Sequence, residues 1–177
     1  MADIVDKATR SRMMSGIRGK NTKPEILLRQ KLHASGYRFR IHRKDLPGKP
    51  DIVLPKYKAV ILVNGCFWHG HDCHLFKMPG TRTEFWQTKI TNNRLNDQKA
   101  TASLLALGWR VLTVWECSLK GKTRIPIEDI MNRIATWLGS GDLQYSIGGT
   151  THESISPTSS HAGTGLPDNI CKGSFSE

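Results

Sequence analysis

Residues 60–74 constrain this chain more than any other stretch, because they join a buried strand to a dense group of metal-binding side chains. Residues 59–63 are apolar, mostly β-branched and followed by Asn64 and Gly65, which predicts a central strand buried on both faces. The sulfur and imidazole side chains that come next are Cys66, His69, His71, Cys73 and His74. A tetrahedral zinc ion prefers such ligands.

Three ligands from one short turn require a fourth from elsewhere in the chain. Residues 112–117 read as a second strand that ends in Cys117. We therefore predict a zinc site made of Cys66, His71, Cys73 and Cys117. The alternative is a set of buried thiols and surface histidines without metal, since C-x4-H-x-C is less specific than paired C-x-x-C motifs.

Phe67 and Trp68 lie between the predicted zinc ligands. Large aromatic residues on a loop held by metal have no obvious core to enter. They could form a hydrophobic plug over the zinc, or they could act as a wedge that enters stacked bases.

The charge of the chain favours a polyanionic partner. Its 177 residues, enough for one domain with its own core, carry 26 Lys and Arg against 15 Asp and Glu. The excess lies in residues 1–139, because residues 140–177 hold one basic and four acidic side chains. Nucleic acid is the leading partner, and a solvated basic surface without a partner is the alternative.

The sequence predicts a cytoplasmic protein with no membrane contact. No apolar segment is long enough to cross a bilayer, and the first residues lack the apolar centre of a signal peptide. In a reducing compartment, closely spaced Cys and His residues indicate metal more often than disulfides.

The pattern of elements predicts an α/β domain whose small mixed sheet is flanked by helices. Helices are expected at residues 21–36, 83–107 and from Pro126 to Leu138, and strands at residues 37–41, 52–54, 59–63 and 109–115. Thr22 and Glu25 form a capping box at the first helix. Residues 1–20 are expected to be a basic arm, residues 21–139 the domain, and residues 140–177 a disordered tail rich in Gly, Ser and Thr.

Asp51 is the candidate catalytic carboxylate. It follows Pro50 at the start of a strand, so it would lie beside the end of the next, antiparallel strand at Val63 and Asn64. Mg²⁺ held there could polarise a phosphate and activate a water, and His69, which the zinc site does not need, could take the proton.

Five runs of the sequence carry a family resemblance. They are ATRSRMMSGIRGKNTKPE, LPGKPD, VILVNGCFWHGHDCHLFKMP, TRTEFW and LGWRVLTVWEC. Through them, residues 1–139 resemble the very short patch repair (Vsr) endonucleases, a family of DNA mismatch nicking enzymes. The resemblance implies a restriction-endonuclease-like fold with a structural zinc, and a nick on the 5′ side of the thymine in a T:G mismatch left by deamination of 5-methylcytosine.

The resemblance also implies roles for single residues. It makes Asp51 the magnesium ligand and His69 a proton carrier, with Glu25 and Asp97 as active-site companions. The four predicted zinc ligands match the family's zinc positions. The positions that match DNA contacts are Phe67, Trp68 and Trp86, which wedge into the duplex, and Met14, Lys89 and Asn93, which lie near the mispaired bases. A T:G pair stacks and pairs less well than a Watson–Crick pair, so opening it costs less.

Two departures from the family pattern affect the predicted catalytic site. Some members have histidine where this chain has Asn64, and asparagine cannot take up a proton, so Asn64 would only form hydrogen bonds beside Asp97. The return strand also lacks the second acid and the lysine of many restriction-like nucleases. Mg²⁺ would therefore use Asp51, the main-chain carbonyl of Val63 and waters.

The expected substrate is double-stranded DNA with a T:G mismatch, in the bacterial cytoplasm. The resemblance implies a functional association with a cytosine-5 methyltransferase and with a repair polymerase and ligase. A nick in one strand needs one active site, which fits a monomer. Two alternatives stay open: a zinc-stapled mismatch-binding protein with weak or no cleavage, and a sequence-specific nuclease of the restriction type.

Overall fold

Four strands form one mixed sheet in the order β1-β2-β3-β4. The computed structural model describes residues 6, 8, 9, 11, 12 and 19–149. β1 (Ile52–Leu54) and β2 (Ala59–Asn64) are antiparallel and joined by the short 3₁₀ helix η1 (Pro55–Tyr57). β2 runs parallel to β3 (Arg110–Trp115), and β3 runs parallel to β4 (Gln144–Ile147). Parallel neighbours need crossover connections, and helices supply both of them here.

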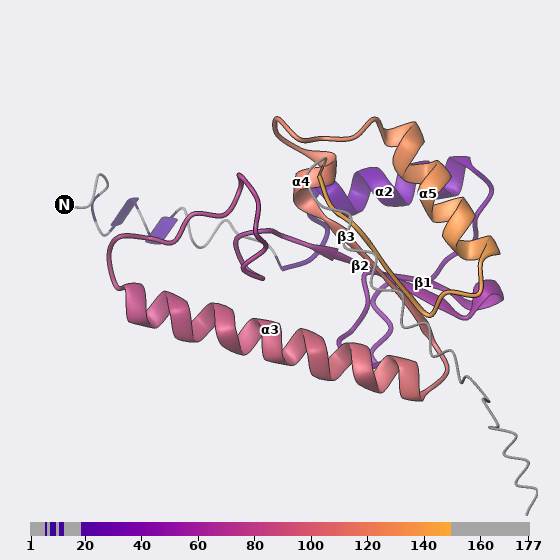
Figure 1. The fold of residues 1–177 in the computed structure, drawn as a ribbon, viewed down its shortest axis with the longest axis horizontal. Helices are drawn as coiled ribbons and strands as arrows, with labels where there is room; N and C mark the ends of the chain where they lie inside the picture. The colour runs from indigo at the N-terminus through magenta and orange to yellow at the C-terminus, as the bar shows by residue number, and fades with distance from the viewer. Residues whose placement is uncertain (1–5, 7, 10, 13–18, 150–177) are drawn as a thin grey trace, which may run out of the picture.

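The helices cover both faces of the sheet. α2 (Lys23–Ala34) and α5 (Ile127–Gly139) lie together on one side, and α3 (Thr83–Ala106) lies on the other (Figure 1). Side chains alternate between the faces along each strand, so Ile61 packs in the core under α2 and α5 while Val60 packs under α3. This three-layer arrangement explains why the central strand is apolar on both faces.

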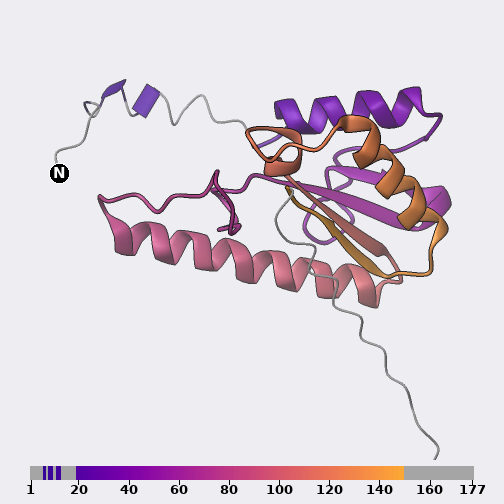
Figure 2. The same ribbon diagram turned by 45° about the horizontal axis from the view of Figure 1, so that its top comes forward.

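α3 extends past the edge of the sheet and is largely exposed. Of its 24 residues, Ile90 and Leu104 are the buried ones. Its N-terminal turns reach beyond the strands and lie beside the loop that follows β2 (Figure 2). The N-terminal turns of α3, which have no sheet beneath them, can therefore contribute side chains to a surface outside the core.

The predicted fold class is confirmed, since a mixed four-stranded sheet flanked by helices is consistent with the restriction-endonuclease-like fold. The predicted cap is present in a modified form: Thr22 Oγ1 accepts from Glu25 N, while the Glu25 carboxylate accepts from the Thr22 hydroxyl at 2.8 Å and from Asn21 N at 2.9 Å. Among the described helices, none is long and apolar enough to cross a membrane.

Three predicted features are corrected. Residues 37–41 do not form a regular strand, because in this segment only Arg40 pairs with the sheet, opposite Val53. Cys117 is not in a strand, because β3 ends at Trp115 and Cys117 is the second residue of the short helix α4 (Glu116–Leu119). Part of the predicted disordered tail is ordered, since β4 completes the sheet with Ile147 fully buried.

Candidate active site and metal centre

The four predicted zinc ligands meet at the ends of β2 and β3. The ligand atoms of Cys66, His71, Cys73 and Cys117 all lie within 4.8 Å of one another. His71 Nδ1 is 3.6 Å from Cys66 Sγ and 3.5 Å from Cys117 Sγ. A tetrahedral zinc with bonds of about 2.3 Å to sulfur and about 2.0 Å to nitrogen separates those atoms by about 3.5 Å. The donor set and its spacing therefore fit zinc.

The surroundings of this cluster favour neutral ligands in the absence of a cation. Burial raises the pKa of the Cys66 and Cys117 thiols and lowers the pKa of the His71 imidazole. A divalent cation reverses this preference for the thiols, because a coordinated thiol loses its proton. Neutral imidazole is already the form of histidine that binds metal. The His71 ring also stacks on Trp115, with centroids 4.1 Å apart.

Aromatic side chains gather where the loop after β2 meets the start of α3. The Phe67 ring contacts Trp68 and Trp86 edge-on, each with centroids 5.3 Å apart, and the Trp68 and Trp86 centroids are 6.0 Å apart. All three side chains remain partly exposed. The loop packs tightly at this point, because a Cβ on Gly70 would lie 2.7 Å from Ile90 Cγ2. The aromatic cluster of Phe67, Trp68 and Trp86 is thus partly exposed, and the loop that carries two of its members is held in place by packing against α3.

A cavity of about 760 Å³ lies between this loop, α3 and the segment before β1. Asp51 lines it, and Asp51 Oδ2 accepts a hydrogen bond from the main-chain N–H of Val63 at 2.8 Å. Burial raises the pKa of the Asp51 carboxyl to about 6, against the opposing effect of the Val63 N–H. The carboxylate thus lies beside the end of the return strand, as the hairpin pattern predicted.

Glu25 reaches the same cavity from α2 but is fully engaged in hydrogen bonds. Its carboxylate is almost completely buried and accepts from Asn21 N, Thr22 Oγ1 and Arg29 Nη2. Arg29 Nη2 in turn donates to the main-chain oxygen of Asp51 at 3.2 Å. Glu25 therefore acts on the site through Arg29, by holding the backbone that carries Asp51.

His69 and Asp97 form a pair on the wall of the cavity. His69 Nδ1 contacts the carboxylate of Asp97, and both side chains are partly buried. An ionised carboxylate only accepts hydrogen bonds, so Nδ1 carries the proton and Nε2 of a neutral ring is free to accept one. This is the arrangement that a general base requires.

One face of α3 supplies the other predicted contacts. Trp86, Lys89, Asn93 and Asp97 recur at helical spacing, which brings them to the same side of the helix. Lys89 is exposed and lines the cavity, while Asn93 Nδ2 donates to the main-chain oxygen of Trp68 at 2.8 Å. The helix thus links the aromatic cluster to the His69–Asp97 pair.

Comparison with known proteins places the chain in a family. The family described as DNA mismatch endonuclease Vsr matches residues 2–75. The chain is 46% identical over 138 residues to the DNA mismatch endonuclease Vsr of Escherichia coli (strain K12), which spans 78% of this chain and 88% of that protein. This chain belongs to the Vsr family.

Other relatives in the family carry the name of nicking enzymes. The chain is 50% identical to the type II nicking enzyme V.XorIIP of Xanthomonas oryzae pv. oryzae (strain KACC10331 / KXO85), over 67% of this chain and 88% of that protein. It is 47% identical to V.NmeAIP of Neisseria meningitidis serogroup A / serotype 4A (strain DSM 15465 / Z2491), over 69% and 87% respectively. The predicted family is confirmed, and a Vsr protein is a DNA endonuclease.

The remaining predicted residues of this Vsr protein are placed as follows. Asn64 ends β2, is partly buried and lines the same cavity as Asp97, and Val63 lies next to it along the strand. Met14 lies outside the described residues, so its predicted contact with the mispaired bases stays a prediction.

Three residues of the site were not predicted. Arg29 bridges Glu25 and Asp51, and its spacing of four residues from Glu25 on one helix is the signal that could have found it. Glu116 Oε2 accepts from Cys66 N at 3.3 Å and lines the cavity, so it connects the Cys/His cluster with the cavity. Trp115 stacks on His71, a contact between segments far apart in the sequence that no local pattern reveals.

Proposed function

We propose that this Vsr protein nicks one strand of duplex DNA on the 5′ side of the thymine in a T:G mismatch, in very short patch repair of deaminated 5-methylcytosine. The observation that carries the proposal is the cavity that joins Asp51 to the His69–Asp97 pair and is bordered by Trp68. Hydrolysis of a phosphodiester and insertion beside a base pair would thus occur on adjoining surfaces.

The catalytic cofactor is proposed to be Mg²⁺. The Asp51 carboxylate and the main-chain carbonyl of Val63 would hold it, with waters completing a shell that Mg²⁺ often keeps. When bound, Mg²⁺ would polarise the phosphate and lower the pKa of the attacking water. The only group of three or more His, Cys, Asp or Glu ligand atoms within residues 19–149 is the zinc cluster, which agrees with a sparse magnesium site.

His69 is proposed as the general base. Its Nε2 would accept the proton of the attacking water, and Asp97 would stabilise the imidazolium that results. Glu25 and Arg29 would keep Asp51 in place, and Asn64 would orient polar groups in the cavity without carrying a proton.

Zinc is proposed as the structural cofactor at Cys66, His71, Cys73 and Cys117. A site with four protein ligands is closed to substrate, which is typical of structural zinc. It would hold the loop that carries Phe67, Trp68 and His69.

The aromatic cluster is proposed to enter the duplex beside the mismatch. Phe67, Trp68 and Trp86 are partly exposed and packed against one another, so they lose little side-chain freedom on binding. The basic surface would supply phosphate contacts, with Lys89 and Asn93 nearer the bases.

The test is a nicking assay with Mg²⁺ on labelled duplexes that differ in one base pair. T:G, T:A and C:G versions of one sequence, with either strand labelled, should give a nick only 5′ of the mispaired thymine. Binding measured on the same duplexes without Mg²⁺ separates recognition from cleavage. Equal nicking of the paired duplexes would contradict the proposal.

Two alternatives have an observation in their favour. Relatives named type II nicking enzymes favour recognition of a particular sequence, which the paired duplexes test. Asn64 favours a mismatch-binding protein that cleaves weakly or not at all, for which T:G binding would persist while Asp51→Asn leaves any residual turnover unchanged.

The biological setting is proposed from the same activity. Methylation by a cytosine-5 methyltransferase creates the base whose deamination gives T:G, and a polymerase and ligase would complete repair after the nick. The protein would act as a monomer on bacterial DNA in the cytoplasm, since one cavity suffices for one nick.

A further inference from the structure

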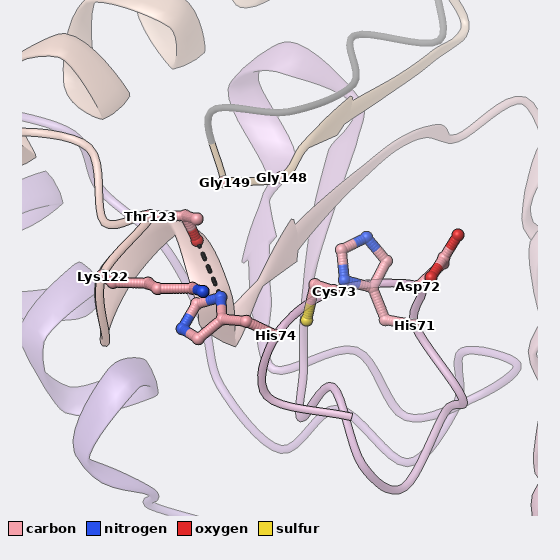
Figure 3. Close-up of a pocket in the computed structure, with 8 residues that line it drawn as sticks. All are labelled: His71, Asp72, Cys73, His74, Lys122, Thr123, Gly148 and Gly149. Atoms are coloured by element: carbon pink, nitrogen blue, oxygen red, sulfur yellow. Dashed lines mark hydrogen bonds between the residues drawn. The ribbon is translucent and has the colours of Figure 1, made fainter. Parts of the chain in front are cut away.

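β4 brings a segment far along the chain to the metal centre. It pairs in parallel with β3, with Val114 opposite Ile147, so the residues after Ile147 emerge where β3 leads into Cys117. Gly148 and Gly149 line a pocket of about 240 Å³ together with His71 and Cys73 (Figure 3). Within this segment, Gly149 N–H bonds to Cys117 and Gly148 lies beside the His71 ring.

The first contact is a hydrogen bond to a ligand atom. The main-chain N–H of Gly149 donates to Cys117 Sγ at 3.3 Å, and Cys117 is fully buried. Three thiolates and a neutral imidazole leave a zinc site with a net negative charge, which sits largely on sulfur. An N–H aimed at sulfur stabilises that charge and orients the ligand.

The second contact reaches the imidazole ligand through Trp115. Ser146 Oγ accepts a hydrogen bond from Trp115 Nε1 at 3.0 Å. The Trp115 ring stacks on His71 with centroids 4.1 Å apart and planes 12° apart. The same ring lies edge-on to His69, with centroids 6.4 Å apart. Ser146 thus fixes a ring that contacts both a zinc ligand and the proposed general base.

We propose that β4 and Gly149 are positioning elements of the zinc site: Gly149 N–H stabilises the Cys117 thiolate and Ser146 holds Trp115 against His71. The inference rests on the proposed zinc site. It assigns to Gly149 and to Ser146 a role in metal retention.

Adjacent glycines offer a matched pair of variants. A Cβ on Gly149 would lie 2.8 Å from Thr123 Cβ and 3.0 Å from the Thr123 main-chain oxygen, so Gly149→Ala forces the donor away from Cys117. A Cβ on Gly148 would lie 3.7 Å from the His71 ring, an ordinary contact, so Gly148→Ala adds the same methyl group without displacement. Ser146→Ala and Ser146→Thr form a second pair at an exposed position where folding is not at risk.

The experiment measures zinc content of the full chain and the rate of zinc transfer to a chromogenic chelator. Gly149→Ala should release zinc about tenfold faster than the parent, and Gly148→Ala at the parent rate. Ser146→Ala should also release zinc faster, by a smaller factor, and Ser146→Thr should restore the parent rate.

Each outcome bears on one proposal. A parent protein that purifies without zinc would reject the zinc site itself. A parent with one zinc per chain, from which Gly149→Ala releases zinc no faster than Gly148→Ala, would overturn the role of Gly149. If Gly149→Ala does not fold, equal release from Ser146→Ala and Ser146→Thr overturns the role of β4.

Discussion

The Cys/His cluster, proposed to hold zinc, and the cavity at Asp51, proposed to be catalytic, lie side by side, yet they are built in opposite ways. The cluster has four ligand atoms within 4.8 Å of one another, and one of them, Cys117 Sγ, accepts a hydrogen bond from Gly149 just past β4. The cavity is open, about 760 Å³ in volume, and is lined by the Asp51 carboxylate and by the His69–Asp97 pair among other side chains. The cluster is assembled by the protein alone, whereas the cavity leaves room for water, metal and phosphate.

This difference suggests that the cluster serves stability and the cavity serves activity. Zinc bound at the proposed site would contribute binding energy to folding and would hold the loop with Trp68. An open site with a buried carboxylate is destabilising when charged, because burial raises the pKa of Asp51 to about 6. Damage to the cluster should therefore cost stability and activity together, and damage to the cavity should cost activity alone.

Asp51→Asn should give the largest effect on nicking. Loss of the magnesium ligand should lower kcat by about 10³-fold or more, because metal assistance contributes several kcal/mol to the barrier. The melting temperature at pH 8 without divalent ions should rise, since the amide has no charge to bury and can still accept from Val63 N–H. Asp45→Asn, at an exposed carboxylate of the preceding loop, is the control and should leave nicking unchanged. A lower melting temperature for Asp51→Asn would contradict the expectation that damage to the cavity costs activity and not stability.

His69→Ala should lower kcat by about 10²–10³-fold with little change in T:G binding, because a general base acts in the chemical step. Asp97→Asn should have a smaller effect in the same direction, since it leaves the imidazole but not its charged partner. Single-turnover nicking measures both. His33→Ala, at an exposed histidine of α2, is the control, and a binding defect as large as the rate defect would assign His69 to DNA contact instead.

Cys66→Ser should cost stability as well as activity. Loss of zinc should lower the free energy of unfolding by about 3 kcal/mol, which corresponds to about 10 °C in melting temperature for a chain of this size. Zinc content, thermal unfolding and nicking are measured on one preparation. His74→Ala changes a neighbouring imidazole outside the four ligands and should keep its zinc. A fully stable Cys66→Ser protein would remove the structural role of the cluster.

Trp86→Ala should weaken the preference for mispaired over paired duplex by about tenfold, since stacking on a base contributes about 1–3 kcal/mol. Leu95→Ala, on the same helix and 47% exposed, is the control. Competition binding with T:G and T:A duplexes measures the ratio. An equal loss of affinity for both duplexes would indicate a general DNA contact.

The smallest expected effects are the pH dependences of Mg²⁺ affinity and of stability. A carboxylate binds Mg²⁺ only when ionised, so the apparent affinity for Mg²⁺ should fall about tenfold for each pH unit below about 6. The native pKa of Asp51 lies above the ordinary 3.8, so the folded protein binds this proton more tightly than the unfolded chain. Without Mg²⁺, its contribution to stability is therefore present below pH 4 and is lost as pH rises through about 6. Asp51→Asn should abolish both dependences.

Local sequence determined most of the helices and strands and supplied the residues of both candidate sites. Three features depend on residues that are close together in the sequence: the cap at Thr22 and Glu25, the apolar strand β2 and the helix α3. Local sequence patterns therefore predicted all three. The spacing of Cys66, His71 and Cys73 predicted for the same reason that these three side chains lie together, and the structure brings them within 4.8 Å of one another. The resemblance to Vsr proteins added Asp97 and Trp86, which no local pattern singled out.

Tertiary structure decided which distant groups support these sites. The sequence did not predict β4, because a four-residue edge strand with exposed polar positions has no strong hydrophobic pattern. Pairing with β3 and burial of Ile147 stabilise this strand. Residues 37–41 showed the opposite error, since alternation alone does not make a strand without a partner along its length. The contacts of Arg29 with Asp51, of Trp115 with His71 and of Gly149 with Cys117 join residues far apart in the chain. Only tertiary packing brings such groups together. Hydrogen bonds and ring contacts act over a few ångströms of space and do not depend on how far apart the residues are in the sequence.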